Sequence, residues 1–292
     1  MKRKLSGVLL GVLAFVFVGA APGPSVASAA EPRNLQLMSW NMCGSQRASW
    51  GCAGTGTPQD KIGVVTYHVT NDFVQAVLLQ EVCENDLTLL MSRLGSGWSK
   101  SFQPYQWSQD GVRANNTCGE SGGRTDRIGT AIVVKAGMTG AQAYSTTQPW
   151  TGQNRPFHCA TATYWNIRLC NVHLTPAHGN PDEPTWEYAD DQLAEIKSIV
   201  GGYPNVAFGG DFNVEPPYFP GNARAWLWPS GLYSTGPGVA GYAECDLGQD
   251  RDTHDGGYKI DYVFSSETKR WCGVGASAYS DHHVVIYSIA VS

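Results

Sequence analysis

Short apolar runs, separated by helical patterns and by loops rich in Gly and Pro, restrict the possible fold of this chain more than any other feature. We expect strands at 34–41, 73–81, 128–135, 157–164, 167–174, 205–211, 259–264 and 283–290. Many of these runs are continuously apolar rather than alternating, which indicates strands that are covered on both faces. The alternation of strands and helices is typical of a layered α/β protein and not of an all-β sandwich.

Local signals predict three helices, at 58–70, 84–94 and 186–200. Thr57 can cap the first of them and Pro58 suits its first turn. Thr185 is the expected N-cap of the third, and the Gly201-Gly202 pair is its expected end. The stretch 215–258 is rich in Pro, Gly and aromatic residues, and we expect it to be mostly loop.

The first thirty residues have the pattern of a secretory signal peptide. Lys2-Arg3-Lys4 precedes an apolar run at 9–18, and Ala27-Ser28-Ala29-Ala30 is a small-residue cleavage site. The apolar run has about ten residues, short of the roughly twenty that a membrane span needs, and an uncleaved anchor is the alternative. We therefore expect a secreted, extracellular protein without a transmembrane span. No linker divides residues 31–292, so we expect a single domain.

All eight cysteines follow this segment. An even number in an oxidising compartment predicts disulfide bonds, and no C-x-x-C pair indicates a zinc ribbon. Short loops or adjacent strands would bring Cys43 close to Cys52 and Cys159 close to Cys170, whereas the pairing of the others stays open. A free buried thiol is the alternative for any one of them. The eight are Cys43, Cys52, Cys83, Cys118, Cys159, Cys170, Cys245 and Cys272.

The charge balance argues against tight, nonspecific binding of nucleic acid. The net charge is −5, and loss of the signal peptide removes three cations and no anion, which makes it −8. Proteins that hold nucleic acid by bulk attraction are usually basic. Any polyanionic substrate must therefore be met by local cations and a metal ion.

Polar residues recur at the ends of the predicted strands, where ligands bind in layered α/β folds. Each of them alone is a weak signal, because an Asn after a strand is usually a turn residue and a Glu there is usually solvated. Together they offer carboxylate, amide and imidazole groups that could hold a metal ion and move protons. The set is Asn41, Glu81, His173, Asp211, Asn213, Asp261, Asp281 and His282.

The ordered set resembles the endonuclease/exonuclease/phosphatase superfamily, the DNase I-like proteins. Its fragments are Ser-Trp-Asn41, Leu-Gln-Glu81, Asn-Val-His173-Leu, Gly-Gly-Asp211-Phe-Asn213, Ile-Asp261-Tyr and Ser-Asp281-His282. The resemblance spans residues 38–287, and Gly-Asp-Phe-Asn and Ser-Asp-His are its most specific pieces. It implies a four-layer α-β-β-α sandwich with two packed mixed β-sheets flanked by helices.

Further motifs are similar to those of the catalytic subunit of cytolethal distending toxins. They are Trp40-Asn41-Met42-x-Gly44-Ser45, Arg155-Pro156, Gly210-Asp211-Phe212-Asn213-x-Glu215-Pro216 and Asp261-Tyr262. This likeness implies a metal-dependent endonuclease that hydrolyses DNA by in-line attack of water. It also implies phosphate contacts from Arg127 and Arg155, for which a surface salt bridge is the alternative. The likeness ends at 175–190 and 216–258, where loops would meet the substrate.

Oxygen ligands suit Mg²⁺, with Ca²⁺ or Mn²⁺ as alternatives, better than zinc. We expect Asn41 and Glu81 to ligate it, with Asp281 in a supporting place. The resemblance implies that Asp211 aligns the attacking water and that Asn213 binds phosphate. If strand geometry continues past Asp211, both of these side chains lie on one face.

His282 is the expected general base, because an imidazole near its free pKa accepts a proton at neutral pH, and Asp261 would orient it. His173 would hydrogen-bond a phosphate oxygen or protonate the leaving group, although an isolated His at a strand end is usually a core residue. Which of the two is the base stays open. We expect His283 to be structural, and we expect His178 and His254 to be surface histidines.

Two other function classes compete with the DNA endonuclease. A sphingomyelinase-type phospholipid phosphodiesterase or a phosphoinositide phosphatase would use the same site, with Tyr218-Phe219 and Trp226-Leu227-Trp228 as a patch against a lipid surface. A non-catalytic binding protein is disfavoured, because every expected catalytic residue type is present in order. We expect a monomer that takes DNA as substrate and not as a stable partner.

Overall fold

The computed structural model describes residues 32–45, 47, 50–119, 123–176, 187–234 and 240–292. The predicted signal peptide, the predicted cap Thr185 and His178 lie outside these residues. In the part of the chain that is described, no helix is both long enough and apolar enough to span a membrane.

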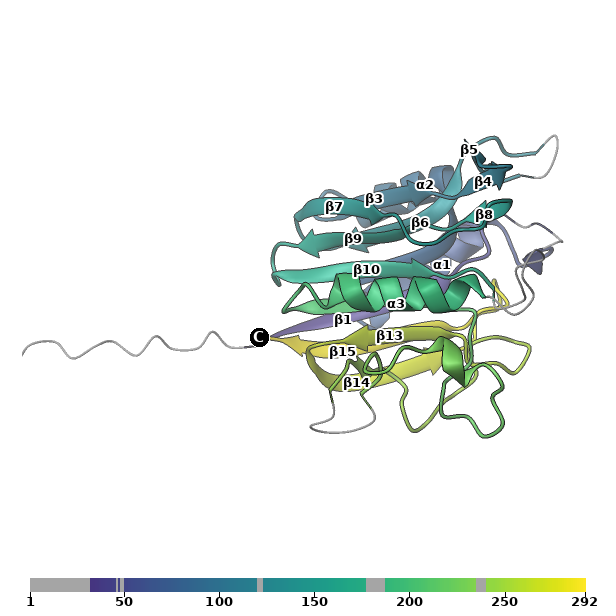
Figure 1. The fold of residues 1–292 in the computed structure, drawn as a ribbon. Coiled ribbons are helices and arrows are strands. Elements are labelled where there is room, and N and C mark those ends of the chain that lie inside the picture. Colours follow the sequence, from purple (N-terminus) through teal and green to yellow (C-terminus); the bar gives the residue numbers. More distant parts are fainter. Residues whose placement is uncertain (1–31, 46, 48–49, 120–122, 177–186, 235–239) are drawn as a thin grey trace, which may run out of the picture. The chain divides into compact units, whose positions relative to one another are not determined.

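Two six-stranded mixed sheets form the centre of the fold (Figure 1). The first has the order β14-β15-β1-β2-β6-β3, and the second has the order β12-β13-β11-β10-β9-β7. One neighbouring pair in each sheet is parallel, β1 with β2 and β10 with β11. The strands of the first are β14 (Thr268–Gly275), β15 (Val284–Val291), β1 (Arg33–Asn41), β2 (Ala76–Cys83), β6 (Ile128–Val134) and β3 (Ser99–Pro104). Those of the second are β12 (Ala243–Glu244), β13 (Asp261–Ser265), β11 (Val206–Asp211), β10 (Ile167–His173), β9 (Phe157–Ala162) and β7 (Met138–Tyr144).

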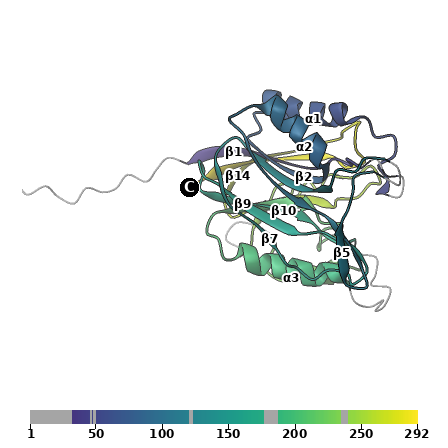
Figure 2. The same ribbon diagram turned by 90° about the horizontal axis from the view of Figure 1, so that it is seen from above.

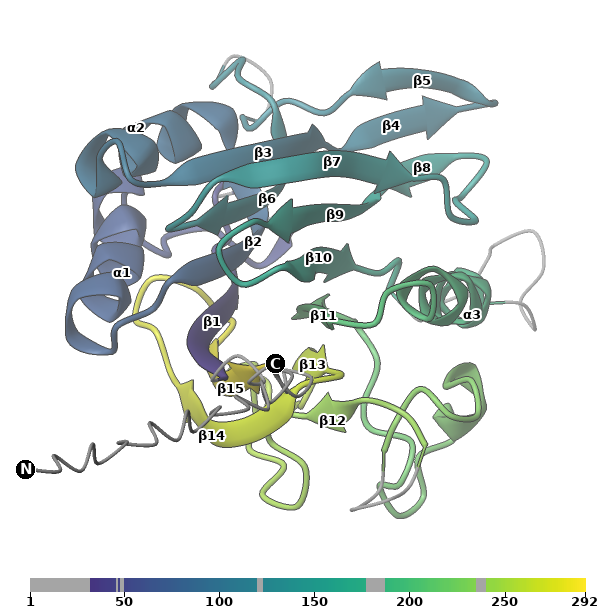
Figure 3. The same ribbon diagram turned by 90° about the vertical axis from the view of Figure 1, so that its left-hand side faces the viewer.

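A third, three-stranded sheet has the order β5-β4-β8. Its strands are β4 (Gln106–Gln109), β5 (Val112–Asn115) and β8 (Gly152–Asn154). Along the chain, β4 and β5 follow β3, and β8 precedes β9. Figure 3 shows the small sheet to the right of β3 and β7. Two residues next to this sheet, Tyr105 and Arg155, are important for the site described below.

Helices cover the outer faces of the two large sheets. They are α1 (Pro58–Asn71), α2 (Glu84–Leu94) and α3 (Tyr188–Val200), with a short 3-10 helix η2 (Ala225–Leu227). In Figure 2, α1 and α2 lie on one side of the paired sheets and α3 lies on the other. Thr57 caps α1, as predicted, and the structure adds a reciprocal capping box with Asp60.

Three apolar layers hold these elements together. The middle layer packs one sheet on the other and includes Leu37, Leu78, Leu169, Val263 and Tyr287. A second layer packs α1 and α2 on the first sheet, and a third packs α3 on the second sheet. Continuous apolar strands are required because both faces of each sheet are covered. The predicted α-β-β-α sandwich is confirmed.

The eight predicted strands are the eight inner strands of the two large sheets. The strands that the sequence did not reveal are their four edges, β14, β3, β12 and β7, and the small third sheet. Edge strands expose one side to water, so they carry no apolar run; β7 is exposed over Thr139–Ala143. The stretch 215–258 is mostly loop in its described part, as expected.

Four disulfide bonds use all eight cysteines. The two predicted pairs, Cys43–Cys52 and Cys159–Cys170, are confirmed, and the latter two residues are directly opposite each other in the β9–β10 register. The pairs that the sequence left open are Cys83–Cys118 and Cys245–Cys272.

Candidate active site

Seven of the eight predicted polar residues come together at one end of the two large sheets. β1, β10 and β11 end there, Glu81 lies near the end of β2, and the antiparallel strands β13 and β15 begin there. Six of the seven residues are almost completely buried, with exposed fractions of 7% or less, and the seventh, Asn213, is partly buried next to them. The six are Asn41, Glu81, His173, Asp211, Asp261 and His282.

The carboxylate of Asp211 is at the centre of this group. Its Oδ2 lies 3.2 Å from Nδ2 of Asn41, 3.4 Å from Nε2 of His173 and 3.6 Å from Nε2 of His282. Burial is the main reason that the pKa of Asp211 is raised, against the opposing charge of His282. Three nitrogen atoms, two from the ends of β1 and β10 and one from the segment before β15, thus converge on one oxygen atom, which is where an attacking water could be aligned.

His282 is held by Asp261, with Nδ1 of the ring 2.9 Å from Oδ2 of the carboxylate. Burial alone lowers the pKa of His282, but Asp261 and Asp211 outweigh it and raise this pKa to about 10. The expected His–Asp pair is therefore present. The expectation that the imidazole has a near-free pKa is wrong, because two buried carboxylates face the ring.

His173 has the opposite electrostatic state. Burial, Arg155 and His282 hold the pKa of His173 well below its ordinary value, so the ring is neutral. Its Nδ1 lies 2.7 Å from the hydroxyl of Tyr105, a fully buried residue that follows β3. No sequence signal identifies Tyr105 as a functional residue, because a lone tyrosine in a Pro-containing loop belongs to no motif.

Glu81 lies in a β-bulge of β2. The β2–β6 register shifts between Leu79 and Val82, and Glu81 has a φ of 53° in the left-handed region. Such a bulge changes the direction of a side chain and is costly for a residue other than glycine, so it is typical of functional positions. Burial raises the pKa of Glu81 to about 7, although Arg155 and His282 oppose the shift.

The donor set fits a hard divalent cation. Glu81 and Asp211 are buried carboxylates with raised pKa values, so a cation between them would relieve their desolvation. Asn41, however, turns Nδ2 toward Glu81 at 3.3 Å, and its Oδ1 accepts a hydrogen bond from the backbone N–H of Cys43. Ligation through Asn41 would require its amide to rotate, whereas Glu81 needs no such change.

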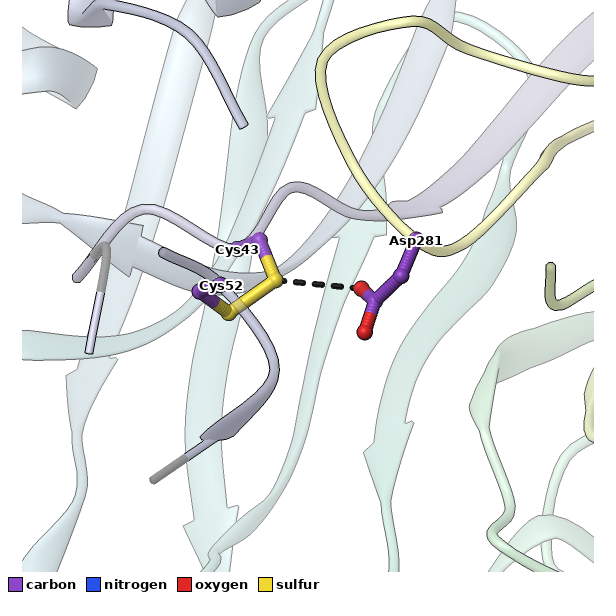
Figure 4. Close-up of side chains that lie close together, drawn as sticks. All are labelled: Cys43, Cys52 and Asp281. Atoms are coloured by element: carbon purple, nitrogen blue, oxygen red, sulfur yellow. Dashed lines mark hydrogen bonds between the residues drawn. A yellow bond between two sulfur atoms is a disulfide. The ribbon is translucent and has the colours of Figure 1, made fainter. Parts of the chain in front are cut away.

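Asp281 lies beside the Cys43–Cys52 disulfide. Its Oδ1 is 3.1 Å from Sγ of Cys43, as Figure 4 shows, and its Oδ2 is 3.4 Å from Nε2 of His254. On the other side of the disulfide, Sγ of Cys52 lies 3.4 Å from Oε2 of Glu81. Disulfide sulfurs carry no hydrogen, so these are non-bonded contacts, and neither cysteine is a metal ligand.

Asn213 is brought next to Asp211 by a turn and not by continued strand geometry. β11 ends at Asp211, whose Oδ1 accepts a hydrogen bond from the backbone N–H of Asn213, and Asn213 has a φ of 53°. Gly210 precedes them at a φ of 147°, where a Cβ atom would lie 1.8 Å from the carbonyl oxygen of Val172. The glycine is thus required by the close approach of β10.

Only one of the two predicted phosphate-binding arginines is near the site. Arg155 donates to the carbonyl of Leu174, which also accepts from Asn213, and its charge acts on Glu81 and His173. Arg127 instead forms two hydrogen bonds to Glu84, of 2.8 and 2.6 Å. Its planar guanidinium matches that carboxylate, so Arg127 fits the salt-bridge alternative.

Two other histidines, His254 and His283, lie close to His282 or next to it in the chain. His254, expected at the surface, is partly exposed, but its ring also packs at 4.8 Å against His282 and contacts Asp281. His283 hydrogen-bonds the backbone of Asp252 and the side chain of Asp255, in agreement with its predicted structural role.

Solved structures with the same fold show low sequence identity to this chain. A Beutenbergia cavernae endonuclease/exonuclease/phosphatase has a TM-score of 0.62 and 14% identity, covering 89% of this chain and 72% of that one. The human Nocturnin catalytic domain with bound sulfate has a TM-score of 0.55 and 16% identity, covering 89% and 94%. D. rerio TDP2 complexed with single-strand DNA product has a TM-score of 0.56 and 15% identity, covering 87% and 98%.

Comparison with curated proteins finds no match. The sequence model of the endonuclease/exonuclease/phosphatase family, in contrast, matches residues 38–282. This range includes every strand that contributes to the site except β15, together with His282. The family consists of enzymes that hydrolyse phosphoester bonds. On this evidence the chain belongs to the endonuclease/exonuclease/phosphatase family.

Proposed function

We propose that this protein is a secreted, Mg²⁺-dependent phosphodiesterase that hydrolyses DNA endonucleolytically. The observation that carries the proposal is the convergence of Asn41, His173 and His282 on one oxygen of Asp211, next to the buried carboxylate of Glu81. Such a group can align a water molecule, bind a phosphate oxygen and place a cation on it.

Each residue has a role that its contacts support. Glu81 and Asp211 would hold the cation, and Asp261 orients His282. Arg155 and Asn213, which share the carbonyl of Leu174, are placed to contact phosphate. When bound, a divalent cation would polarise a phosphate oxygen and neutralise part of the negative charge that raises the pKa of His282.

DNA is the proposed substrate for two reasons. The chain has motifs similar to those of cytolethal distending toxins, around Asn41, Arg155, Asp211 and Asp261. One protein of the same fold, D. rerio TDP2, has been solved with single-strand DNA product. The acidic net charge of the chain favours a transient substrate over a stable nucleic-acid partner.

The phospholipid alternative has less structural support. Of the residues expected to meet a lipid surface, Leu227 and Trp228 are buried against the second sheet, with exposed fractions of 1% and 8%. Trp226 is exposed, and Tyr218 is partly exposed but hydrogen-bonds Asp250 through its hydroxyl. The predicted apolar patch is therefore broken up.

Secretion, removal of residues 1–30, a single domain over 31–292 and a monomeric state are part of the proposal. The charged start, the short apolar run and the small residues before position 31 support export. Four disulfides support an oxidising compartment.

A substrate panel tests the proposal. The purified, oxidised protein is incubated with supercoiled DNA, RNA, sphingomyelin and a phosphoinositide, each with Mg²⁺ or with EDTA. We expect nicked and then linear DNA only with Mg²⁺. His282→Ala should lower the rate of DNA nicking by about 10²- to 10⁴-fold, whereas His68→Ala on α1 should leave it unchanged. Faster turnover of either lipid than of DNA would contradict the assignment of DNA as substrate.

A further inference from the structure

The hydroxyl of Tyr105 lies between two residues of the candidate active site. Its oxygen is 2.7 Å from Nδ1 of His173 and 3.1 Å from the backbone nitrogen of Glu81. The ring of Tyr105 packs edge-on against the ring of His173, with centroids 5.5 Å apart at 80°. The tyrosine side chain is completely buried, so the choice of hydrogen-bond partner is limited to these neighbours.

The direction of each hydrogen bond follows from the chemistry of the partners. The backbone N–H of Glu81 can only donate, so the hydroxyl of Tyr105 accepts from it. The hydroxyl has one hydrogen of its own, and Nδ1 of His173 is its remaining partner among the described residues. If Nδ1 carried a proton, both groups would present hydrogens, and one would be left without an acceptor in a buried place.

The proton of the neutral His173 ring is therefore on Nε2. This atom lies 3.4 Å from Oδ2 of Asp211, in the centre of the site. His282 has the opposite arrangement, because the carboxylate of Asp261 accepts a hydrogen bond from its Nδ1. The partner of Nδ1 thus determines which chemistry each ring can present at Nε2.

We propose that Tyr105 is a positioning residue that holds His173 as the Nε2–H tautomer, so that this ring presents a hydrogen-bond donor, and not a base, to a substrate phosphate. The catalytic part of this inference rests on the proposed phosphodiesterase function, whereas the tautomer does not. The two histidines then have different roles at Nε2, because only His282 can become a proton acceptor there.

The tautomer can be read without any variant or substrate. In protein labelled with ¹⁵N-histidine, long-range ¹H–¹⁵N correlation spectra separate protonated from unprotonated ring nitrogens. The His173 signals are identified by their loss in His173→Gln. We expect a protonated Nε2 and an unprotonated Nδ1 at neutral pH. A protonated Nδ1 would overturn the proposal, even if the enzyme proved active on DNA.

The variant Tyr105→Phe removes the hydroxyl and keeps the ring. We expect the His173 nitrogen shifts to move toward a mixture of tautomers, and kcat to fall on the order of 10- to 100-fold with KM little changed, a range typical of losing a group that orients a functional imidazole. Unchanged His173 shifts would contradict the proposal. Tyr287→Phe is the matched control, because this buried tyrosine donates to the carbonyl of Ala243 away from the site.

A double-variant comparison separates positioning from general loss of structure. If Tyr105 acts through His173, Tyr105→Phe should lower activity no further in a His173→Gln background. Additive losses would contradict the proposal. Failure of the proposed function would look different, since the wild-type protein would then show the expected tautomer and no hydrolysis of any phosphodiester.

Discussion

Oδ2 of Asp261 lies 2.9 Å from Nδ1 of His282, and this contact turns the other ring nitrogen toward Asp211. Both carboxylates are buried and raise the pKa of the imidazole to about 10 although burial opposes them. The contact with Asp261 fixes the orientation and the tautomer of the imidazole, as general acid–base catalysis by a histidine requires.

The variant Asp261→Asn should therefore lower kcat by about 10²-fold or more, because the amide can hold His282 in the wrong tautomer. Initial rates of plasmid nicking measure the effect. Asp255→Asn is the control, since Asp255 makes the same type of contact with the neighbouring His283 at 3.0 Å. Equal rates for the two variants would mean that the Asp261–His282 pair has no catalytic role.

Glu81 should show a conflict between stability and metal binding. Burial raises the pKa of Glu81 to about 7 from 4.5 in the unfolded chain, so the folded state loses stability as pH rises between these values. Glu81→Gln should then stabilise the EDTA-treated protein at pH 8 by roughly 1–3 kcal/mol. It should also abolish the rise in Tm that Mg²⁺ causes in the wild type. Calorimetry with and without Mg²⁺ measures both, and an unchanged Mg²⁺ response would exclude Glu81 as a ligand.

Because of His158, the folded state should lose stability in acid, independently of the active site. Burial and Arg168 lower the pKa of His158 from 6.5 to about 3, and its Nε2 lies 2.7 Å from the hydroxyl of Ser101. Because the unfolded chain binds the proton more readily, stability is complete above about pH 6.5 and falls by up to about 4–5 kcal/mol toward pH 3. Urea unfolding of wild type and His158→Gln should show a shallower pH slope for the variant. Identical slopes would refute the prediction.

Two disulfides of similar loop length should behave differently when removed. Cys43–Cys52 and Cys159–Cys170 close loops with sequence separations of 9 and 11, so each should contribute ~2–3 kcal/mol of stability. Only the first contacts Glu81 and Asp281. The double serine variant of that pair should therefore also bind Mg²⁺ more weakly, as measured by Mg²⁺ titration of activity. Equal Mg²⁺ dependence in both serine pairs would contradict this role.

The two arginines offer a direct test of which cation meets substrate. Arg155→Ala should raise KM or lower kcat severalfold or more, because its charge acts within the site, on Glu81 and His173. Arg127→Ala should have nearly wild-type kinetics and a small loss of stability, because Arg127 is paired with Glu84 in a partly exposed place. Steady-state kinetics distinguish them. A larger kinetic effect of Arg127→Ala than of Arg155→Ala would mean that Arg127 contacts the substrate phosphate.

The sequence predicted inner strands and strand-end chemistry because these depend on local pattern. An apolar run such as Ile128–Val134 has to be covered on both faces, and a polar residue that follows such a run lies where the strands of the sheet end. The side-chain partners could not be predicted in this way. Arg127 reaches Glu84, 43 residues away, because β2 pairs with β6. Tyr105 reaches His173, 68 residues away, because the two large sheets pack on each other.

The backbone conformation at the site could not be predicted from the sequence either. The left-handed φ of Glu81 depends on a bulge between β2 and β6, which no property of Leu-Gln-Glu reveals. The edge strands were missed for a related reason, because an exposed segment such as β14 has no apolar pattern to distinguish it from a loop.

Hydrolysis of bis-p-nitrophenyl phosphate by wild type and Asp211→Asn tests whether the residues around Asp211 form a metal-dependent phosphodiesterase site. This generic phosphodiester needs no recognition of DNA, and Asp211 contacts Asn41, His173 and His282. We expect turnover with Mg²⁺, none with EDTA, and a loss of about 10²- to 10⁴-fold in Asp211→Asn, with Asp255→Asn unchanged. Equal turnover by wild type and Asp211→Asn, or turnover that EDTA leaves intact, would mean that this group of residues is not a metal-dependent phosphodiesterase site.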